Sequence, residues 1–190
     1  MGSKTSTLLQ KEEIDDIQKE TGFSKRQIVR LYSRFESLDK SDNGALSRED
    51  LLRIPELAIN PLGDRIIHAF FMDSPDSKIN FRQFMRTLSL FRPIKTHDCE
   101  TACNSRDNKL KFAFRMYDLD NSGAVTRDEL LVILQMMVGS NITEEQLGSI
   151  ADRTIAEADE DATGAITYEN FAKALGRSDV EQMMSIRFLN

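Results

Sequence analysis

One polar stretch decides the fold of this chain: Asp118-Leu119-Asp120-Asn121-Ser122-Gly123-Ala124-Val125-Thr126-Arg127-Asp128-Glu129. A calcium-binding loop needs oxygen ligands at positions 1, 3, 5, 7, 9 and 12, where position 7 uses its carbonyl and position 9 often acts through a water. A glycine at position 6 allows the sharp turn, and a glutamate at position 12 binds with both oxygens. The stretch meets every requirement, so we predict these calcium ligands: Asp118, Asp120, Ser122, Ala124, Thr126 and Glu129.

Apolar residues with helical spacing flank this loop on both sides, and the same template recurs around loops 39–50, 72–83 and 159–170. Helix, twelve-residue loop and helix is the EF-hand arrangement. At position 8 of the loops, Leu46 is expected to pair with Ile79, and Val125 with Ile166, in short antiparallel strands. The sequence therefore predicts an all-α fold of four EF-hands in two paired lobes, with short β pairings between the loops.

The loop at 159–170 departs from the pattern at its last position. Oxygen ligands are available earlier in this loop, from Asp159, Asp161, Thr163 and Ala165. Position 12, however, is Asn170, whose amide offers one neutral oxygen in place of a charged pair. We expect weaker calcium binding here than at 118–129, and both a weak site and a loop without an ion fit the sequence. Glu169 could replace Asn170 only if the following helix turned and took Phe171 away from the core.

The first two loops are weaker candidates. Loop 39–50 ends in Asp50, which is one methylene shorter than glutamate, so a contracted loop would suit magnesium better than calcium. We expect mainly a structural role for it. Loop 72–83 begins with Met72, carries Pro75, has no glycine at position 6 and ends with Gln83. We predict that it serves only as a structural partner.

Composition excludes several classes of protein. The chain has 190 residues and a net charge of −6, so it repels phosphate backbones and nucleic-acid binding is not expected. The longest apolar stretch, 130–138, is too short to span a membrane. Two histidines and the absence of phosphate-loop or nucleophile-elbow motifs argue against an enzyme. His97, Cys99 and Cys103 could suggest zinc or a reactive thiol, but we interpret them as solvated linker residues.

We divide the chain into five parts: an N-terminal segment with an acidic helix (1–23), a first lobe (24–91), a linker (92–104), a second lobe (105–175) and a C-terminal helix or flap (176–190). Gly2 followed by Ser6 is the N-myristoylation pattern. One myristoyl chain binds membranes only marginally, so a partner must help to hold the protein there. The C-terminal helix either closes its own lobe or covers a groove for a partner helix, for which Met85, Met116, Met136 and Met137 are candidate lining residues.

Four strings resemble the calcineurin B homologous proteins, with calcineurin B as the next relative: 1–3, 54–67, 146–155 and 184–189. The resemblance implies myristoylation at Gly2, calcium in the last two hands and a cytoplasmic protein peripheral to the plasma membrane, with nuclear export. It also implies binding to a juxtamembrane helix of sodium/proton exchangers, which supports their activity and surface stability. Inhibition of calcineurin phosphatase and a role in vesicle traffic along microtubules are implied too. The sequence departs from the family at Asn170 and in the linker.

Three functions are therefore compared. The leading prediction is a calcium-binding regulatory subunit that clamps the exchanger helix. The first alternative is the regulatory B-type subunit of a calcineurin-like phosphatase, and the second is a simple calcium buffer. A buffer would be expected to keep most of its loops competent, whereas two impaired loops between intact helices favour a scaffold for a partner.

Overall fold

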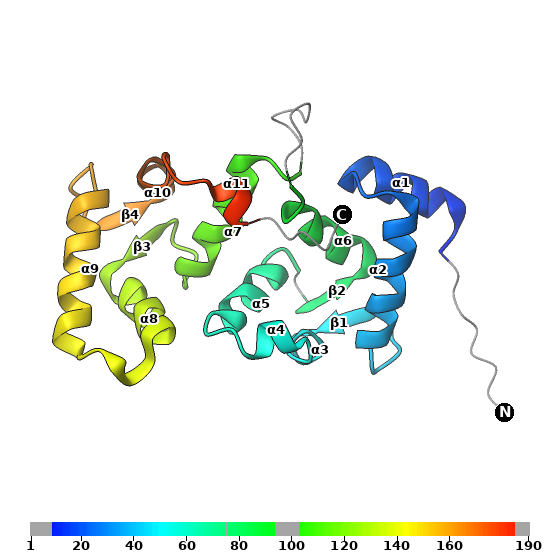
Figure 1. Ribbon diagram of the computed structural model, residues 1–190, viewed down its shortest axis with the longest axis horizontal. Coiled ribbons are helices and arrows are strands. Elements are labelled where there is room, and N and C mark those ends of the chain that lie inside the picture. Colours follow the sequence, from blue (N-terminus) through cyan, green and yellow to red (C-terminus); the bar gives the residue numbers. More distant parts are fainter. Residues whose placement is uncertain (1–8, 75, 94–102, 185–190) are drawn as a thin grey trace.

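The computed structural model describes residues 9–74, 76–93 and 103–184, which form two helical lobes side by side (Figure 1). The first lobe contains α1 (Lys11–Thr21), α2 (Lys25–Leu38), β1 (Ala45–Ser47), α3 (Arg48–Leu51), α4 (Pro55–Ala58), α5 (Gly63–Phe71), β2 (Lys78–Asn80) and α6 (Phe81–Leu90). The second contains α7 (Arg106–Tyr117), β3 (Ala124–Thr126), α8 (Arg127–Val138), a short 3-10 turn (Gly139–Asn141), α9 (Glu144–Ala158), β4 (Ala165–Thr167), α10 (Tyr168–Ala174) and α11 (Val180–Met183).

The first three loops start their following helices through capping boxes. In the third loop, Thr126 accepts a hydrogen bond from the backbone of Glu129, whose side chain in turn accepts from the backbone of Thr126. Ser47 with Asp50 and Asn80 with Gln83 form the same box in the first and second loops. These are positions 9 and 12 of each loop, so the residues spaced for an ion also satisfy the free N–H groups of a helix start.

Each lobe is tied together by a two-stranded antiparallel pairing of its loops. Leu46 lies opposite Ile79 in one pair, and Val125 lies opposite Ile166 in the other. All four side chains are buried. Both pairings predicted from the sequence are confirmed in the predicted register, and so is the all-α EF-hand fold.

Helix α7 joins the two lobes. Phe112 packs edge-to-face on Phe70 and Phe91 of the first lobe, with ring centroids 5.9 and 5.2 Å apart. Two residues further on, Phe114 packs against Tyr168 and Phe171 of the second lobe. Residues i and i+2 of a helix lie on nearly opposite faces. One helix therefore contributes to both cores.

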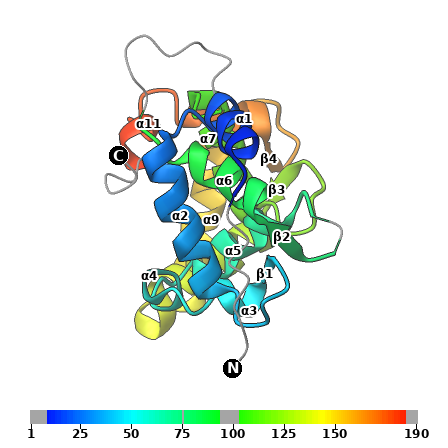
Figure 2. The ribbon, with the colours of Figure 1, turned by 90° about the vertical axis from the view of Figure 1, so that its right-hand side faces the viewer.

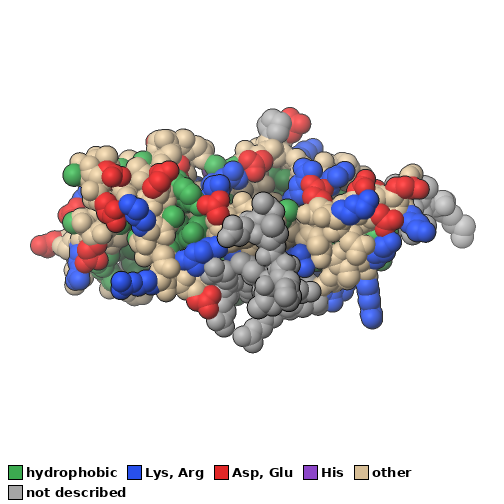
Figure 3. All heavy atoms as spheres, turned by 90° about the horizontal axis from the view of Figure 1, so that it is seen from above, with side chains coloured by type: hydrophobic (Ala, Val, Ile, Leu, Met, Phe, Trp, Pro, Cys, Tyr) green, Lys and Arg blue, Asp and Glu red, His purple; other side chains and the backbone are tan. Residues whose placement is uncertain are grey.

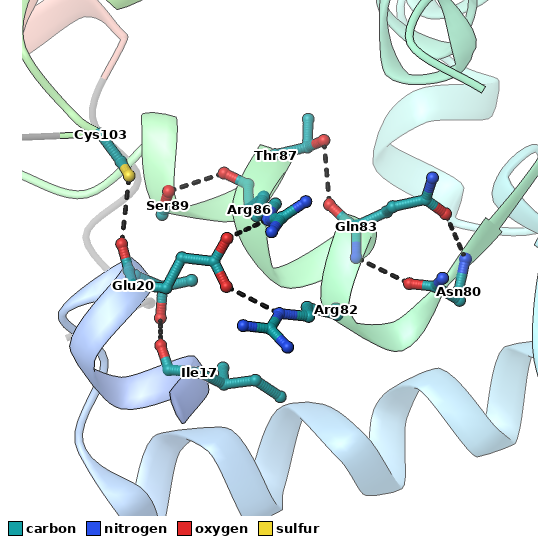
Figure 4. A network of polar contacts seen from close by, with 10 residues as sticks. Ile17, Glu20, Asn80, Arg82, Gln83, Arg86, Thr87, Ser89 and Cys103 are labelled. Carbon is teal, nitrogen blue, oxygen red and sulfur yellow. Dashed lines mark hydrogen bonds and ion pairs between the residues drawn. The ribbon is translucent and has the colours of Figure 1, made fainter. Parts of the chain in front are cut away.

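Helix α1 covers the first lobe, where it packs against α2 and α6 (Figure 2). Its Glu20 carboxylate lies between Arg82 and Arg86 of α6, and Arg82 Nε is 2.8 Å from Glu20 Oε2 (Figure 4). The Cys103 thiol donates to the Glu20 carbonyl at 3.1 Å. Burial alone would raise the pKa of Glu20, but the hydrogen bonds and charges of the two arginines lower it below the ordinary value of 4.5.

Replacing Glu20 by glutamine is expected to lower the free energy of unfolding by about 1 kcal/mol at pH 7, since both guanidinium groups are half exposed and screened by water. A lowered pKa in the folded state gives stability that is present above pH 4.5 and disappears as the pH falls through the folded pKa. The difference between wild type and Glu20→Gln in urea unfolding should therefore shrink as the pH falls below 4.5. A difference of equal size at pH 7 and pH 3, or an equal loss in the exposed control Glu36→Gln, would contradict this role.

One predicted groove residue lies elsewhere. Met85 is fully buried in the core of the first lobe, because its position on α6 faces that core rather than solvent. None of the described helices is long and apolar enough to cross a bilayer.

Candidate calcium site and apolar groove

The third loop brings three carboxylates to one point. Asp118, Asp120 and Glu129 each offer an oxygen, and these oxygens lie within 4.8 Å of one another. Two ligands on opposite sides of a calcium ion, at 2.3–2.6 Å each, would stand about 5 Å apart. Among the described residues this is the one cluster of three or more histidine, cysteine or acidic side chains with such spacing. The donors present therefore fit calcium.

The backbone of this loop already has the turn that the ligands require. Gly123 at position 6 has a φ of 89°, a conformation that glycine adopts without strain. The two carboxylate oxygens of Asp118 accept hydrogen bonds from the N–H groups of Ser122 and Gly123, both at 3.0 Å. Ser122 Oγ lies 3.0 Å from the Ala124 carbonyl oxygen. The predicted ligands at positions 1, 5 and 7 thus share one hydrogen-bonded turn.

Glu129 at position 12 is buried, with 8% of its surface exposed. Its Oε1 accepts from the N–H groups of Leu119 and Asp120, and its Oε2 accepts from the N–H and hydroxyl of Thr126. Burial alone would raise the pKa of Glu129, but these hydrogen bonds outweigh it and lower the pKa. Glu129 is therefore held as a carboxylate, the form that binds a cation. Thr126, predicted to act through a water, is the cap of α8.

The fourth loop has the same turn but a different last position. Asp159 accepts from the N–H groups of Thr163 and Gly164, as Asp118 does in the third loop. Asn170 is 1% exposed, and its Nδ2 donates to Asp161 Oδ2 at 3.2 Å, while its Oδ1 has no partner. In the fourth loop, an amide hydrogen of Asn170 therefore occupies an oxygen of the Asp161 carboxylate. The equivalent carboxylate of the third loop, Asp120, is one of the predicted calcium ligands.

Glu169, the other candidate for the last position of this loop, is exposed. The following Phe171 packs instead against Phe114 and Tyr117, with ring centroids 5.4 and 5.8 Å apart. A rotation of α10 that placed Glu169 in the loop would break this packing of Phe171. Asn170 therefore holds position 12.

The first loop places Asp39, Ser41 and Asn43 in a similar turn, but its carboxylate at position 12 has other partners. Asp50 Oδ2 accepts from the N–H and hydroxyl of Ser47, and Oδ1 lies 3.6 Å from Arg53. A cation next to this carboxylate opposes the binding of a second cation. In the second loop Met72 and Gln83 supply no charge. Gly2, His97 and Cys99 lie outside the described residues.

An apolar groove of about 470 Å³ opens in the second lobe. It lies between α7, α8, α10 and α11, and its lining includes Met116, Ile133, Leu134, Met137, Phe171, Val180 and Met183. Hydrophobic side chains gather in this lobe when the molecule is seen from above (Figure 3, left). Of the predicted groove residues, Met116 and Met137 line it, whereas Met136 is an exposed neighbour on α8.

Two long-range contacts of this site could not be found by sequence reasoning. Arg65 Nε on α5 donates to the Met116 carbonyl at 3.1 Å, close to the end of the helix that leads into Asp118. Lys109 on α7 lies fully buried between the lobes. Neither residue belongs to a repeated pattern, because each contact depends on how the two lobes are placed.

Paired helix–loop–helix units, linked by short strands and carrying a three-carboxylate loop, define an EF-hand calcium-binding protein. The EF-hand domain pair family matches residues 107–176, which cover the third and fourth hands. The calcineurin B protein of Naegleria gruberi is 44% identical over 187 residues, which cover 98% of this chain and 99% of that protein. The type 2 calcineurin B protein of Dictyostelium discoideum is 43% identical over 190 residues, covering 99% and 98%.

The chain therefore belongs to the calcineurin B family. It is a calcium-binding regulatory EF-hand protein, and the cofactor predicted from the sequence, calcium, is confirmed. The narrower resemblance to the calcineurin B homologous proteins stays a prediction.

Proposed function

We propose that this chain is the regulatory B-type subunit of a calcineurin-type phosphatase and holds an amphipathic helix of the catalytic subunit in the apolar groove of its second lobe. The observation that carries the proposal is the similarity to calcineurin B proteins along nearly the whole length of both chains. On this proposal, the third hand is the main calcium site, and the first two hands are structural.

The groove has the chemistry that a docking helix needs. Its lining is almost entirely apolar, and Met116 and Met137 provide flexible, polarisable side chains that adapt to the shape of a partner. The chain around it carries a net charge of −6, so a helix with a basic outer face is favoured over an acidic one. A helix with apolar anchors at i, i+3, i+4 and i+7 and basic residues elsewhere fits both properties.

The direct test is to mix the full-length chain with the catalytic subunit that pairs with the Dictyostelium discoideum relative and to measure the complex by size-exclusion chromatography with calcium present. We expect a complex with one copy of each chain. The type 2 calcineurin B protein of Dictyostelium is the positive control. No complex with this chain, under conditions where the control forms one, would overturn the proposal.

Replacing Leu134 by glutamate is expected to weaken that complex by roughly 100-fold, because the charge would be buried in an apolar groove without a partner. Val132 offers a matched control, since it lies on the same helix but is 42% exposed and outside the groove. Val132→Glu should leave the dissociation constant within about twofold. Equal losses in both variants would place the docking site elsewhere.

The exchanger role predicted from the sequence uses the same groove, so a peptide of an exchanger juxtamembrane helix is a second arm of this experiment. A tighter fit to that peptide than to the catalytic subunit would favour the sequence-based prediction. Inhibition of the phosphatase and a role in vesicle traffic go with this exchanger alternative, on the resemblance to the calcineurin B homologous proteins. A location at the plasma membrane through myristate on Gly2 is proposed on that resemblance too. Mass spectrometry of the N-terminus tests the lipid directly.

A further inference from the structure

The C-terminal segment that borders the groove is held by the helix next to it. Lys109 on α7 is 0% exposed, and its ammonium donates to three backbone carbonyls: Leu90 at 2.6 Å, Arg92 at 3.0 Å and Met184 at 3.1 Å. These carbonyls come from the end of α6, the residues after it and the end of α11. One buried cation therefore joins the first lobe to the C-terminal segment.

One turn earlier on α7, Arg106 repeats this chemistry. Its guanidinium donates to the carbonyls of Leu175 at 2.6 Å and Ser178 at 3.1 Å, at the start of the same segment. Residues three apart lie on one face of a helix, so the two cations form a row along α7. Because their acceptors in this segment are carbonyls, the two cations fix the backbone of 175–184 independently of its side chains.

Among the described side chains of helix α11, one is a buried anchor. The helix spans only Val180–Met183, too short to be stable without tertiary contacts. Val180 is 4% exposed and is its buried anchor, whereas Met183 is 79% exposed. Both side chains, with Met184, form one side of the groove. Figure 1 shows α11 lying beside α7 at this side of the lobe.

Helix α11 forms one wall of the groove. Its Val180 and Met183, with Met184, line the groove together with Met116 of α7 and Phe171 of α10. A partner helix that packs directly against α7 at this point would need the place that α11 now fills.

We propose that α11 is a displaceable cover of the groove, held by Lys109 and Arg106, and that a partner helix enters by replacing it. This rests on the proposed function, whose docking site it regulates. When α11 is displaced, the Lys109 ammonium loses the carbonyl of Met184 but still donates to the carbonyls of Leu90 and Arg92. The buried charge therefore keeps hydrogen-bond partners. The cover can therefore open while the junction of the lobes stays closed.

The experiment compares full-length wild type with Val180→Ser, which removes the apolar anchor of α11. The matched control is Val29→Ser, the same change at a half-exposed site on α2. The probe is a synthetic amphipathic helix of about five turns, with leucine on one face and lysine on the other. We expect Val180→Ser to bind it about fivefold more tightly than wild type, and Val29→Ser to match wild type. Lys109→Met, if it folds, should shift affinity in the same direction as Val180→Ser.

A gain in affinity is a result that general damage to the fold would not give. Equal or weaker binding by Val180→Ser, when wild type binds the peptide, would overturn the cover. If wild type does not bind the peptide, an apolar fluorescent dye decides: a larger signal with Val180→Ser supports the cover, and an unchanged signal overturns it. Failure of the proposed function is recognised separately, by the absence of a complex with the catalytic subunit.

Discussion

Glu129→Gln is expected to weaken calcium binding at the third hand by roughly 100-fold, which would remove most of the binding heat of the whole chain. Glutamine has the same length, and its amide oxygen can still accept from the N–H of Thr126 at the start of α8. Its NH2 group cannot accept the two hydrogen bonds that Glu129 Oε1 receives from Leu119 and Asp120. What disappears is one of three negative charges whose oxygens lie within 4.8 Å of one another. The change therefore removes this charge while keeping the length of the side chain.

Isothermal titration calorimetry of the calcium-stripped protein measures this effect. The neighbouring Asp128 is the matched control, because it is an exposed carboxylate in the first turn of α8 and lies outside the cluster. Asp128→Asn should leave the strong site almost unchanged. An unchanged isotherm for Glu129→Gln would show that the strong site is elsewhere.

Asn170→Glu is expected to have the opposite effect at the fourth hand and to create a second strong site. A third carboxylate would join Asp159 and Asp161, and calcium affinity there should rise by roughly 100-fold. The same change removes the amide that now donates to Asp161, so the calcium-free protein should lose about 1 kcal/mol of stability through repulsion. Calcium should more than restore this loss.

Calorimetry should then report two strong sites in Asn170→Glu and thermal unfolding a larger shift with calcium than in wild type. Glu169→Gln is the control, since Glu169 is exposed and lies at position 11 of the loop, next to Asn170. It should bind calcium like wild type. A loss of calcium binding in Glu169→Gln would mean that Glu169, not Asn170, serves the fourth hand.

Local features of the sequence predicted much of the fold because EF-hands repeat. The pairing of Leu46 with Ile79 and of Val125 with Ile166 follows from loop position alone, and both are seen. The three carboxylates of the third loop meet because their spacing is set by one turn around Gly123. In such a loop the contacts span twelve residues or fewer, so the order of residues is enough to place them.

Contacts between distant segments could not be predicted in this way. Periodicity shows that Met85 is on an apolar face, but not that this face meets the core of the first lobe instead of the groove. Phe112 and Phe114 are both aromatic residues of one helix, yet they enter different cores. From the sequence, Lys109 would be expected to be an exposed helix residue. Its burial depends on carbonyls from three other segments, which surround its ammonium only in the folded chain.

We propose that one loop, from Asp118 to Glu129, supplies the strong calcium site of this family member. The most direct test of this proposal is a calcium titration of the stripped, full-length wild-type chain, followed by calorimetry to count the strong sites. The structure predicts one strong site, with any further binding much weaker. No strong site, or two sites of equal strength, would contradict the account.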